Sequence, residues 1–206
     1  MKVSLTDAGK RFNRDWIFRH LNYTFQQANS YAIIGPNGSG KSTLLQVLSG
    51  AMQLSEGNCE WSIVNGQLEN ENIFNQVSIC APYLEVVEEM TLREFLDFHS
   101  RFKPFLPSLT ITEIISAVGL ANAANKQIRY YSSGMKQRVK LAQAIFSDTF
   151  LLLLDEPCTN LDEEGINLYH HLINEHCRQR LVIVSSNDEA EYSFCAHRIN
   201  ITSYKK

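Results

Sequence analysis

The sequence predicts an α/β fold in which helices alternate with the strands of a largely parallel sheet. Two continuous apolar runs, at residues 150–154 and 181–185, are typical of strands covered on both faces. A third run, at residues 30–34, leads into a glycine-rich loop that is followed by a helical pattern. This alternation favours an α/β core, and the mostly helical stretch at residues 91–147 is expected to be inserted in it.

Each element is predicted from its apolar spacing and from the residues that flank it. The strands are expected at residues 2–5, 16–25, 30–34, 59–64, 77–80, 150–154 and 181–185. The helices are expected at residues 41–49, 91–99, 112–118, 134–146, 162–177 and 188–194. Gly9 and residues 13–15 should interrupt the first strands, and Thr91 with Glu94 three residues later has the pattern of a capping box.

Composition limits the classes of protein that this chain can represent. Its 206 residues suffice for one domain, expected to span residues 1–206, because no linker, repeat or low-complexity tract divides them. Hydrophobic residues make up 44% and charged residues 20%, which is ordinary for a globular protein. The formal net charge of -3 argues against nucleic acid as the main partner, so none is expected.

Targeting signals and cysteine usage indicate a cytoplasmic protein. No stretch approaches the roughly 18–20 apolar residues that cross a bilayer, and polar residues interrupt the N-terminus too early for a secretory signal. The cysteines are far apart and form no C-x-x-C pair, so buried thiols in a reduced compartment explain them better than disulfides or zinc. They are Cys59, Cys80, Cys158, Cys177 and Cys195.

The glycine-rich loop fits the phosphate-binding pattern G-x-x-x-x-G-K-[ST] in full. Its glycines allow the backbone N–H groups to converge, and the following helix adds the partial positive charge of its N-terminus. Lys41 supplies a full charge for the outer phosphates, and the Ser42 hydroxyl is placed to bind Mg²⁺. A simple turn is the alternative, but the flanking strand and helix favour the functional interpretation. The predicted nucleotide-binding residues of this P-loop are Gly35, Pro36, Asn37, Gly38, Ser39, Gly40, Lys41, Ser42 and Thr43.

Two adjacent acids, Asp155 and Glu156, end the apolar strand at residues 150–154. Ligands of parallel sheets collect at the carboxyl ends of the strands, where the P-loop also lies. Asp155 is therefore predicted to hold Mg²⁺, and Glu156 to polarise the water that attacks the γ-phosphate. A strand that ends in a solvated turn is the alternative, which the accompanying P-loop makes weaker.

Beyond these motifs, nearly the whole chain resembles the ATPase domain of ABC (ATP-binding cassette) proteins. The segment Tyr-Ser-Ser-Gly-Met at residues 131–135 stands where the family has its L-S-G-G-Q signature. The segment Asp-Glu-Pro-Cys-Thr-Asn-Leu-Asp at residues 155–162 is similar to the Walker B and D-loop run D-E-P-T-x-x-L-D. Gly50 and Gly57 also match the glycines that follow the P-loop helix in the family.

The resemblance implies a P-loop NTPase core of ABC ATPase type, with N-terminal antiparallel strands and an inserted helical and signature subdomain at about residues 84–147. It implies a head-to-tail dimer in which ATP lies between the P-loop of one copy and the signature segment of the other. It also implies that Phe12, or less readily Trp16, stacks on adenine, although a core aromatic residue is the alternative. The implied contacts to the second copy's ATP are Ser132, Ser133, Gly134 and Met135.

Three motifs depart from the family's pattern. Tyr83 stands where a glutamine is usual in the Q-loop, and Gln76 is too early to replace it. Asn187 occupies the place of the switch histidine, and an amide can donate a hydrogen bond to the γ-phosphate but cannot gain a proton near neutral pH. In the signature, Ser133 and Met135 replace glycine and glutamine. These departures predict ATP hydrolysis that is slow or that depends on a partner.

The implied function is that of an ATP-binding and ATP-hydrolysing subunit that powers a separate membrane-spanning transporter subunit. It would lie on the inner face of the cell membrane and contact its partner through residues 83–90, whose acids Glu85, Glu88 and Glu89 suggest a basic segment opposite, with a solvated acidic face as the alternative. A soluble or regulatory ABC ATPase of low activity is the alternative function. The compact size is similar to that of small exporter ATPases, including those linked to cytochrome c maturation, but it identifies no substrate.

Overall fold

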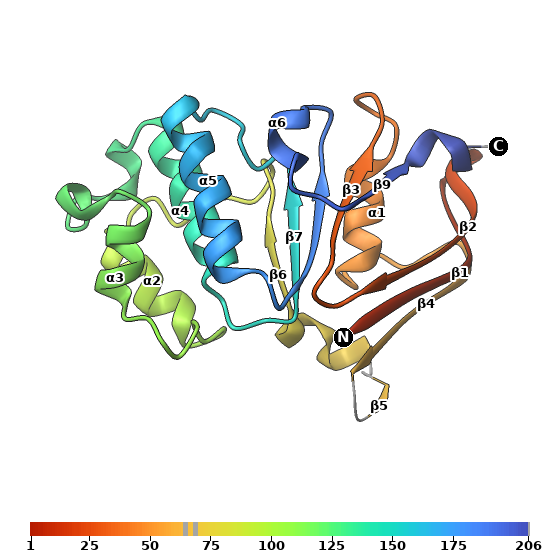
Figure 1. Cartoon of the computed structure of the whole chain (residues 1–206), viewed down its shortest axis with the longest axis horizontal. Helices are drawn as coiled ribbons and strands as arrows, with labels where there is room; N and C mark the ends of the chain where they lie inside the picture. Colours follow the sequence, from red (N-terminus) through yellow and green to blue (C-terminus); the bar gives the residue numbers. More distant parts are fainter. Residues whose placement is uncertain (64–65, 68–69, 206) are drawn as a thin grey trace.

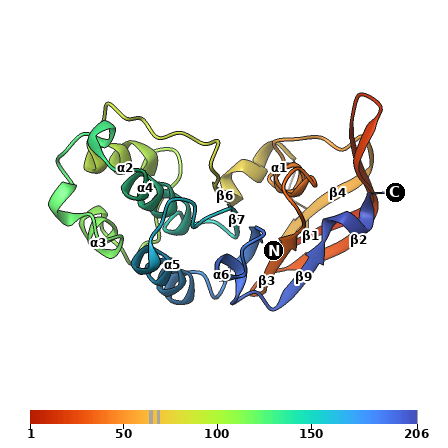
Figure 2. The same ribbon diagram turned by 90° about the horizontal axis from the view of Figure 1, so that it is seen from above.

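The computed structural model describes residues 1–63, 66–67 and 70–205 (Figure 1). Within these ranges the strands form two sheets, one antiparallel and one parallel, and helices cover the parallel sheet on both faces (Figures 1 and 2). The α/β class, the parallel sheet and the antiparallel N-terminal strands are therefore confirmed. The predicted strand at residues 59–64 is present, but its last residue, Val64, lies outside the described residues.

In the described ranges, the antiparallel sheet has four strands in the order β2-β1-β4-β5. They are β1 (Lys2–Phe12), β2 (Asp15–Gln26), β4 (Glu56–Ile63) and β5 (Gly66–Gln67). The predicted break near Gly9 is wrong, because β1 runs through it with shifts of register between Leu5 and Ala8 and between Ala8 and Lys10. Such bulges bend a strand without ending it, so the glycine marks an irregularity and not a loop.

The parallel sheet has the strand order β6-β7-β8-β3-β9 across the described residues. Its strands are β3 (Ser30–Ile34), β6 (Val77–Cys80), β7 (Leu151–Asp155), β8 (Leu181–Ser185) and β9 (His197–Asn200). All pairings are parallel, so β3, β7 and β8 bring their carboxyl ends to one edge. Sequence reasoning missed β9, because its only buried residue is Ile199 and the pattern carries little apolar signal.

The predicted helices are present with boundaries that differ by a few residues at most. They are α1 (Lys41–Leu48), α2 (Leu92–Ser100), α3 (Ile111–Ala117), α4 (Ser133–Ile145), α5 (Glu163–His176) and α6 (Glu189–Tyr192). Short 3₁₀ turns occupy Asn70–Gln76, Ala121–Ala123, Ile128–Tyr130 and Ile201–Tyr204. Each helix in the described ranges falls short of the length and apolar character that crossing a bilayer requires.

The continuous apolar strands divide their side chains between two hydrophobic clusters. Leu151 and Leu153 of β7 pack in the cluster that holds α1 and the antiparallel sheet. Leu152 and Leu154 of the same strand pack in the other cluster, with helices α2 to α5. Full burial of one such side chain contributes about 1.5–3 kcal/mol, so helices on both faces stabilise the central strands. This arrangement holds the carboxyl end of β7, where the acids lie, in a fixed position.

A buried arginine connects the end of α4 to the central sheet. Arg180 is 5% exposed, and its guanidinium donates to the carbonyl oxygen of Ile145 at 2.7 Å and to the hydroxyl of Ser78 at 2.7 Å. The partial negative charge at a helix C-terminus favours a cation there, although burial still lowers the pKa of Arg180. These contacts join the last turn of α4 to β6, so α4 is held at the end opposite the signature residues.

Candidate nucleotide-binding site

The P-loop connects β3 to α1, as the sequence predicts. Gly40 is the residue before α1 and has a φ angle of 104°, a conformation that side chains with a Cβ atom rarely adopt. A Cβ atom at Gly40 would lie 2.2 Å from Cγ2 of Ile17 on β2. The glycine therefore allows both the left-handed turn and the close approach of β2 to the loop.

A cavity of about 220 Å³ lies in front of this loop. Sequence reasoning missed Ile17, because its contact with the loop joins segments that are distant in the chain. The predicted Lys41, Ser42 and Glu156 meet at this cavity. Its lining residues are Ile17, Asn37, Gly38, Gly40, Lys41, Ser42, Thr43 and Glu156.

Lys41 and Asn187 are in direct contact. Residue Lys41 is 5% exposed. Its ammonium group donates to the carbonyl oxygens of Gly35 at 2.8 Å and Pro36 at 3.3 Å. It also donates to Oδ1 of Asn187 at 3.2 Å, and Nδ2 of Asn187 donates to Oδ1 of Asn37 at 2.6 Å. The residue in the switch position is therefore placed against the P-loop by its own hydrogen bonds.

The oxygen ligands expected for Mg²⁺ lie at the end of β7 and in the first turn of α1. Asp155 ends β7 and is 2% exposed, and its Oδ1 accepts a hydrogen bond from the Ser185 hydroxyl of β8 at 2.7 Å. Ser42 lines the cavity in front of the P-loop. A hydroxyl and a carboxylate are the hard oxygen donors that Mg²⁺ prefers, so the residues present fit this ion.

Ser39 provides a further indication that the loop receives an anion. Its residue is 2% exposed, and the hydroxyl lacks a hydrogen-bond partner among the described residues. A buried polar group without a partner is unfavourable, and a serine hydroxyl can donate to a phosphate oxygen. The loop geometry therefore fits the phosphates of a nucleotide.

Glu156 follows β7 directly and has a φ angle of 45°, which is uncommon for a residue other than glycine. Its N–H donates to the carbonyl oxygen of Ser185 at 2.9 Å. Glu156 lines the P-loop cavity and also a second cavity of about 320 Å³, which Asn187 and Glu191 share. The carboxylate is thus at the boundary of two cavities, where a water molecule can reach it.

The signature residues form a separate cavity of about 450 Å³. Ser132 caps α4 by accepting a hydrogen bond from the N–H of Met135 at 3.2 Å. Gly134 lies close to the D-loop, since a Cβ atom there would be 2.9 Å from the carbonyl oxygen of Asn160. As far as the described residues show, this cavity and the P-loop cavity share no lining residue. Its lining residues are Gly119, Leu120, Asn122, Ala123, Ser132, Ser133, Gly134, Met135, Arg138, Asn160, Leu161 and Asp162.

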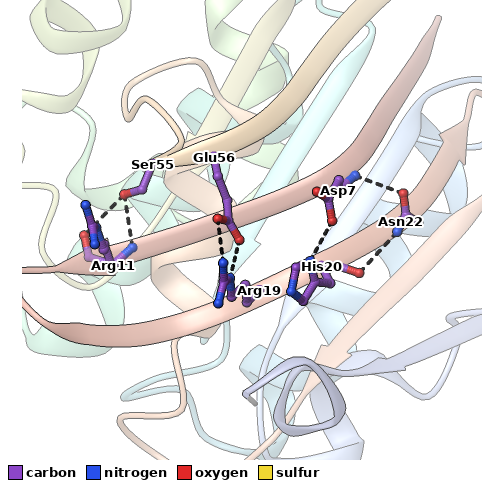
Figure 3. A network of polar contacts seen from close by, with 7 residues as sticks. All are labelled: Asp7, Arg11, Arg19, His20, Asn22, Ser55 and Glu56. Carbon is purple, nitrogen blue, oxygen red and sulfur yellow. Dashed lines mark hydrogen bonds and ion pairs between the residues drawn. The ribbon is translucent and has the colours of Figure 1, made fainter.

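The two candidate aromatic residues differ in their surroundings. Phe12, at the end of β1, is 46% exposed. Trp16 is covered by guanidinium groups, which lie 4.5 Å (Arg19) and 5.4 Å (Arg11) from the centre of its ring. Arg19 is also paired with Glu56, since its Nε donates to Oε1 of Glu56 at 2.5 Å (Figure 3). The Lys10 ammonium also lies 5.3 Å from the centre of the Phe12 ring, so among the described residues Phe12 has one cation beside it and Trp16 has two.

Tyr83 extends to the P-loop helix and is 48% exposed. Burial raises the pKa of its hydroxyl, and a hydrogen bond with Gln46 of α1 opposes that shift. The position that usually holds a glutamine is thus occupied by a half-exposed phenol.

The acids in the predicted docking segment are partly neutralised within the chain. Glu88 pairs with Lys136 of α4 at 2.5 Å, and Glu89 pairs with Arg129 at 3.3 Å. Two of the three acids of residues 83–90 are therefore paired within the chain, and docking through this segment stays a prediction. In the described part of the chain the five cysteines are free thiols, and four are buried, in line with the sequence analysis.

Comparisons with known proteins agree with this geometry. The sequence model of a family described as "ABC transporter" matches residues 18–159, which is more than half of the chain. The chain is 31% identical to an uncharacterized ABC transporter ATP-binding protein, YybJ of Bacillus subtilis, over 92% of this chain and 87% of that protein. It is 28% identical to the bacitracin transport ATP-binding protein BcrA of Bacillus licheniformis, over 88% of this chain and 60% of that protein.

Two further similarities concern a relative and a solved structure. The cytochrome c biogenesis ATP-binding export protein CcmA of Aliivibrio fischeri is 28% identical, over 82% of each chain. The structure of a putative ABC transporter ATP-binding protein from Pyrococcus furiosus superposes with a TM-score of 0.83 at 22% identity, over the full length of both chains. At 22% identity, this superposition shows that the two chains share a fold.

Proposed function

Since the chain belongs to the ABC transporter family of ATP-binding proteins, we propose that it binds Mg-ATP in the P-loop cavity and hydrolyses it to drive a separate membrane-spanning subunit. The observation that carries the proposal is the direct contact of Lys41 with Asn187, because Glu156 lines both the P-loop cavity of Lys41 and the neighbouring cavity of Asn187. In this proposal the Lys41 ammonium, the Asn187 amide and the Glu156 carboxylate surround the position of the terminal phosphate.

Each residue of the site has a distinct role in this proposal. The N–H groups of residues 35–43 and the Lys41 ammonium bind the phosphates, and Ser42 with Asp155 holds Mg²⁺. Mg²⁺ supplies positive charge that offsets the charge of the phosphate oxygens when it is bound. Glu156 polarises the attacking water, and Asn187 donates a hydrogen bond to the γ-phosphate through its amide.

Turnover is proposed to be slow or dependent on a partner. An asparagine in the switch position is shorter than histidine and cannot carry a proton, so it stabilises developing charge on the phosphate less well. Tyr83, Ser133 and Met135 alter three further contacts. These same substitutions support the second candidate, a regulatory ABC ATPase that pairs with a more active copy.

The partner and the location follow from the family. Relatives such as BcrA and CcmA are described as a transport and an export ATP-binding protein, which supports a membrane-spanning partner for this chain. We place the chain on the inner face of the cell membrane, bound to that partner through residues 83–90. The contacts of Ser132, Ser133, Gly134 and Met135 are assigned to ATP held by a second copy in a head-to-tail dimer.

The test compares turnover in the full chain with three variants. Asn187→His is expected to hydrolyse ATP at least about tenfold faster, because a positioned histidine commonly contributes a factor of 10²–10⁴. Lys41→Ala should abolish the heat of ATP binding in calorimetry with Mg²⁺, and Glu156→Gln should bind ATP but not turn it over. If the wild type is already as fast as Asn187→His, the proposal of slow turnover is wrong, and continued turnover of Glu156→Gln would remove Glu156 from its role.

A further inference from the structure

One peptide bond, between Pro157 and Cys158, is held from both sides by buried side chains of two different helices. On one side, Nε2 of Gln137 on α4 donates to the carbonyl oxygen of Pro157 at 2.7 Å. On the other side, the N–H of Cys158 donates to Oε1 of Glu191 on α6 at 2.7 Å. Gln137 is 3% and Glu191 5% exposed, so both hydrogen bonds are shielded from water.

This peptide follows a residue whose backbone is strained. Glu156 has its φ angle at 45°, and a residue with a side chain in such a conformation is unfavourable unless its surroundings hold it. The proline ring at residue 157 fixes the next φ angle, so little freedom remains between Glu156 and the held peptide. Fixing the Pro157–Cys158 peptide therefore fixes the direction in which the Glu156 side chain leaves the backbone.

The two helices also carry other parts of the site. Gln137 lies on the helix that the signature residue Ser132 caps, and its Nε2 also approaches Sγ of Cys80, at the end of β6, at 3.7 Å. Glu191 lies four residues after Asn187, and its backbone carbonyl accepts a hydrogen bond from the Tyr169 hydroxyl of α5 at 3.0 Å. Figure 1 places α6 next to the carboxyl end of β7.

We propose that Gln137 and Glu191 are positioning residues that together hold Glu156 in its left-handed conformation through the Pro157–Cys158 peptide. They act on the reaction by setting the place of the Glu156 carboxylate and not by a chemical step of their own. The inference rests on the proposed role of Glu156. It adds that α4, which follows the signature residue Ser132, and α6, which follows Asn187, both control the position of that carboxylate.

The alternative, that these residues only stabilise the fold, predicts a different result. A residue that fixes the attacking group changes kcat, because misplacement by about 1 Å can slow a reaction by about 100-fold. A residue that only stabilises the fold lowers the melting temperature and leaves kcat of the folded protein unchanged. Two side chains that hold one peptide should also be non-additive, since the loss of either one already releases it.

The experiment uses the full chain with Gln137→Leu, Glu191→Leu and the double variant, in single-turnover ATP hydrolysis. We expect each single variant to lower the hydrolysis rate about 10- to 100-fold with ATP affinity within about twofold of wild type, and the double variant to lose little more. Glu191→Gln keeps an oxygen that can accept from the Cys158 N–H and should restore most of the rate. Gln143→Leu on α4 and Glu189→Leu on α6 are the matched controls and should leave the rate unchanged.

A second readout does not depend on activity. The N–H of Cys158 should exchange with deuterium about tenfold or more faster in Glu191→Leu than in wild type or Glu191→Gln, because its shielded hydrogen bond is lost. Unchanged rates in both leucine variants would overturn the inference, and so would a Glu191→Gln rate as low as that of Glu191→Leu. If Glu156→Gln abolishes hydrolysis while Gln137→Leu and Glu191→Leu hydrolyse ATP at the wild-type rate, only this inference is wrong. If Glu156→Gln still hydrolyses ATP, the proposed role of Glu156 is wrong, and this inference with it.

Discussion

The ammonium group of Lys41 is hydrogen-bonded to its own loop and to the side chain in the switch position. It donates to the carbonyl oxygens of Gly35 and Pro36 and to the Asn187 side chain. A hydrogen bond from an ammonium group to a phosphate oxygen joins two opposite charges, whereas the carbonyl and amide oxygens that Lys41 contacts carry no full charge. We therefore expect phosphate oxygens to be better acceptors for the Lys41 ammonium than these neutral oxygens, whereas Nδ2 of Asn187 is bonded to Oδ1 of Asn37 and not to Lys41.

The exposed Phe12 gives a prediction about adenine recognition. Phe12→Ala should weaken ATP binding about 5- to 100-fold, since stacking of one base on an aromatic ring contributes about 1–3 kcal/mol. Binding of inorganic tripolyphosphate should not change, because it has no base to stack. Titration calorimetry with both ligands measures the ratio of the two affinities.

Trp16→Ala serves as the comparison for that prediction. Trp16 packs under Arg11 and Arg19, so its loss should lower the free energy of unfolding and leave the ratio of ATP to tripolyphosphate affinity as in wild type. If Trp16→Ala shifts that ratio and Phe12→Ala does not, the two aromatic residues have been assigned the wrong way round.

Among the elements, the helices of the inserted stretch begin with the capping signals that the sequence contains. Thr91 accepts a hydrogen bond from the Glu94 N–H at 3.3 Å, and the Glu94 carboxylate accepts from the Thr91 N–H at 2.8 Å. Thr110 and Glu113 make the same reciprocal pair at the start of α3. Each box satisfies backbone donors that the first turn of a helix leaves without partners.

The capping box of α2 predicts both a stability loss and its pH dependence. Thr91→Ala should lower the free energy of unfolding by about 0.5–2 kcal/mol, the usual range for loss of an N-cap, measured by urea denaturation at pH 7. The backbone and hydroxyl hydrogen bonds from Thr91 lower the pKa of Glu94.

The sign of the pH effect follows from that lowered pKa. A carboxyl group with a depressed folded-state pKa contributes stability above its ordinary pKa, and this contribution disappears as the pH falls through the folded-state value. The gap in stability between wild type and Glu94→Ala should therefore narrow as the pH falls from 7 through the acid range below about 4.3. A gap that stays constant over this range would show that the Glu94 charge takes no part in the cap.

At the scale of the whole molecule, the P-loop cavity and the signature cavity are built from different parts of the chain. Residues from β2, α1 and the end of β7 line the first, and residues around α4 and the D-loop line the second. Since the two cavities have no lining residue in common within the described part of the chain, a nucleotide in the P-loop cavity is expected not to contact the signature residues of its own chain. The separation supports a pairing of two chains in which each supplies one half of a site.

This separation predicts how dimerisation responds to substitutions. Glu156→Gln with Mg-ATP should sediment as a dimer, because bound ATP persists when the attacking water is no longer polarised. Adding Ser133→Glu should return the protein to a monomer with ATP affinity within about twofold, because its carboxylate repels the phosphates held by the other copy. Ser133 is exposed, and a negative charge in the first turn of α4 is favourable for that helix.

Ser116→Glu on α3 is the control, since it adds the same charge to an exposed site outside the signature cavity. It should leave the dimer of Glu156→Gln intact in analytical ultracentrifugation. A dimer that persists with Ser133→Glu would place the contact between chains elsewhere.

The sequence by itself determined the features that depend on neighbouring residues. The P-loop, the acids after β7, the Thr91 capping box and the apolar strands are all readable, because their hydrogen bonds and their periodicity act within a few residues. The tertiary structure decided which distant groups meet: Ile17 against Gly40, Asn187 against Lys41, and Gln137 with Glu191 around one peptide. Such contacts join segments separated by many residues, so they depend on how the sheet and its helices pack and leave no local pattern in the chain.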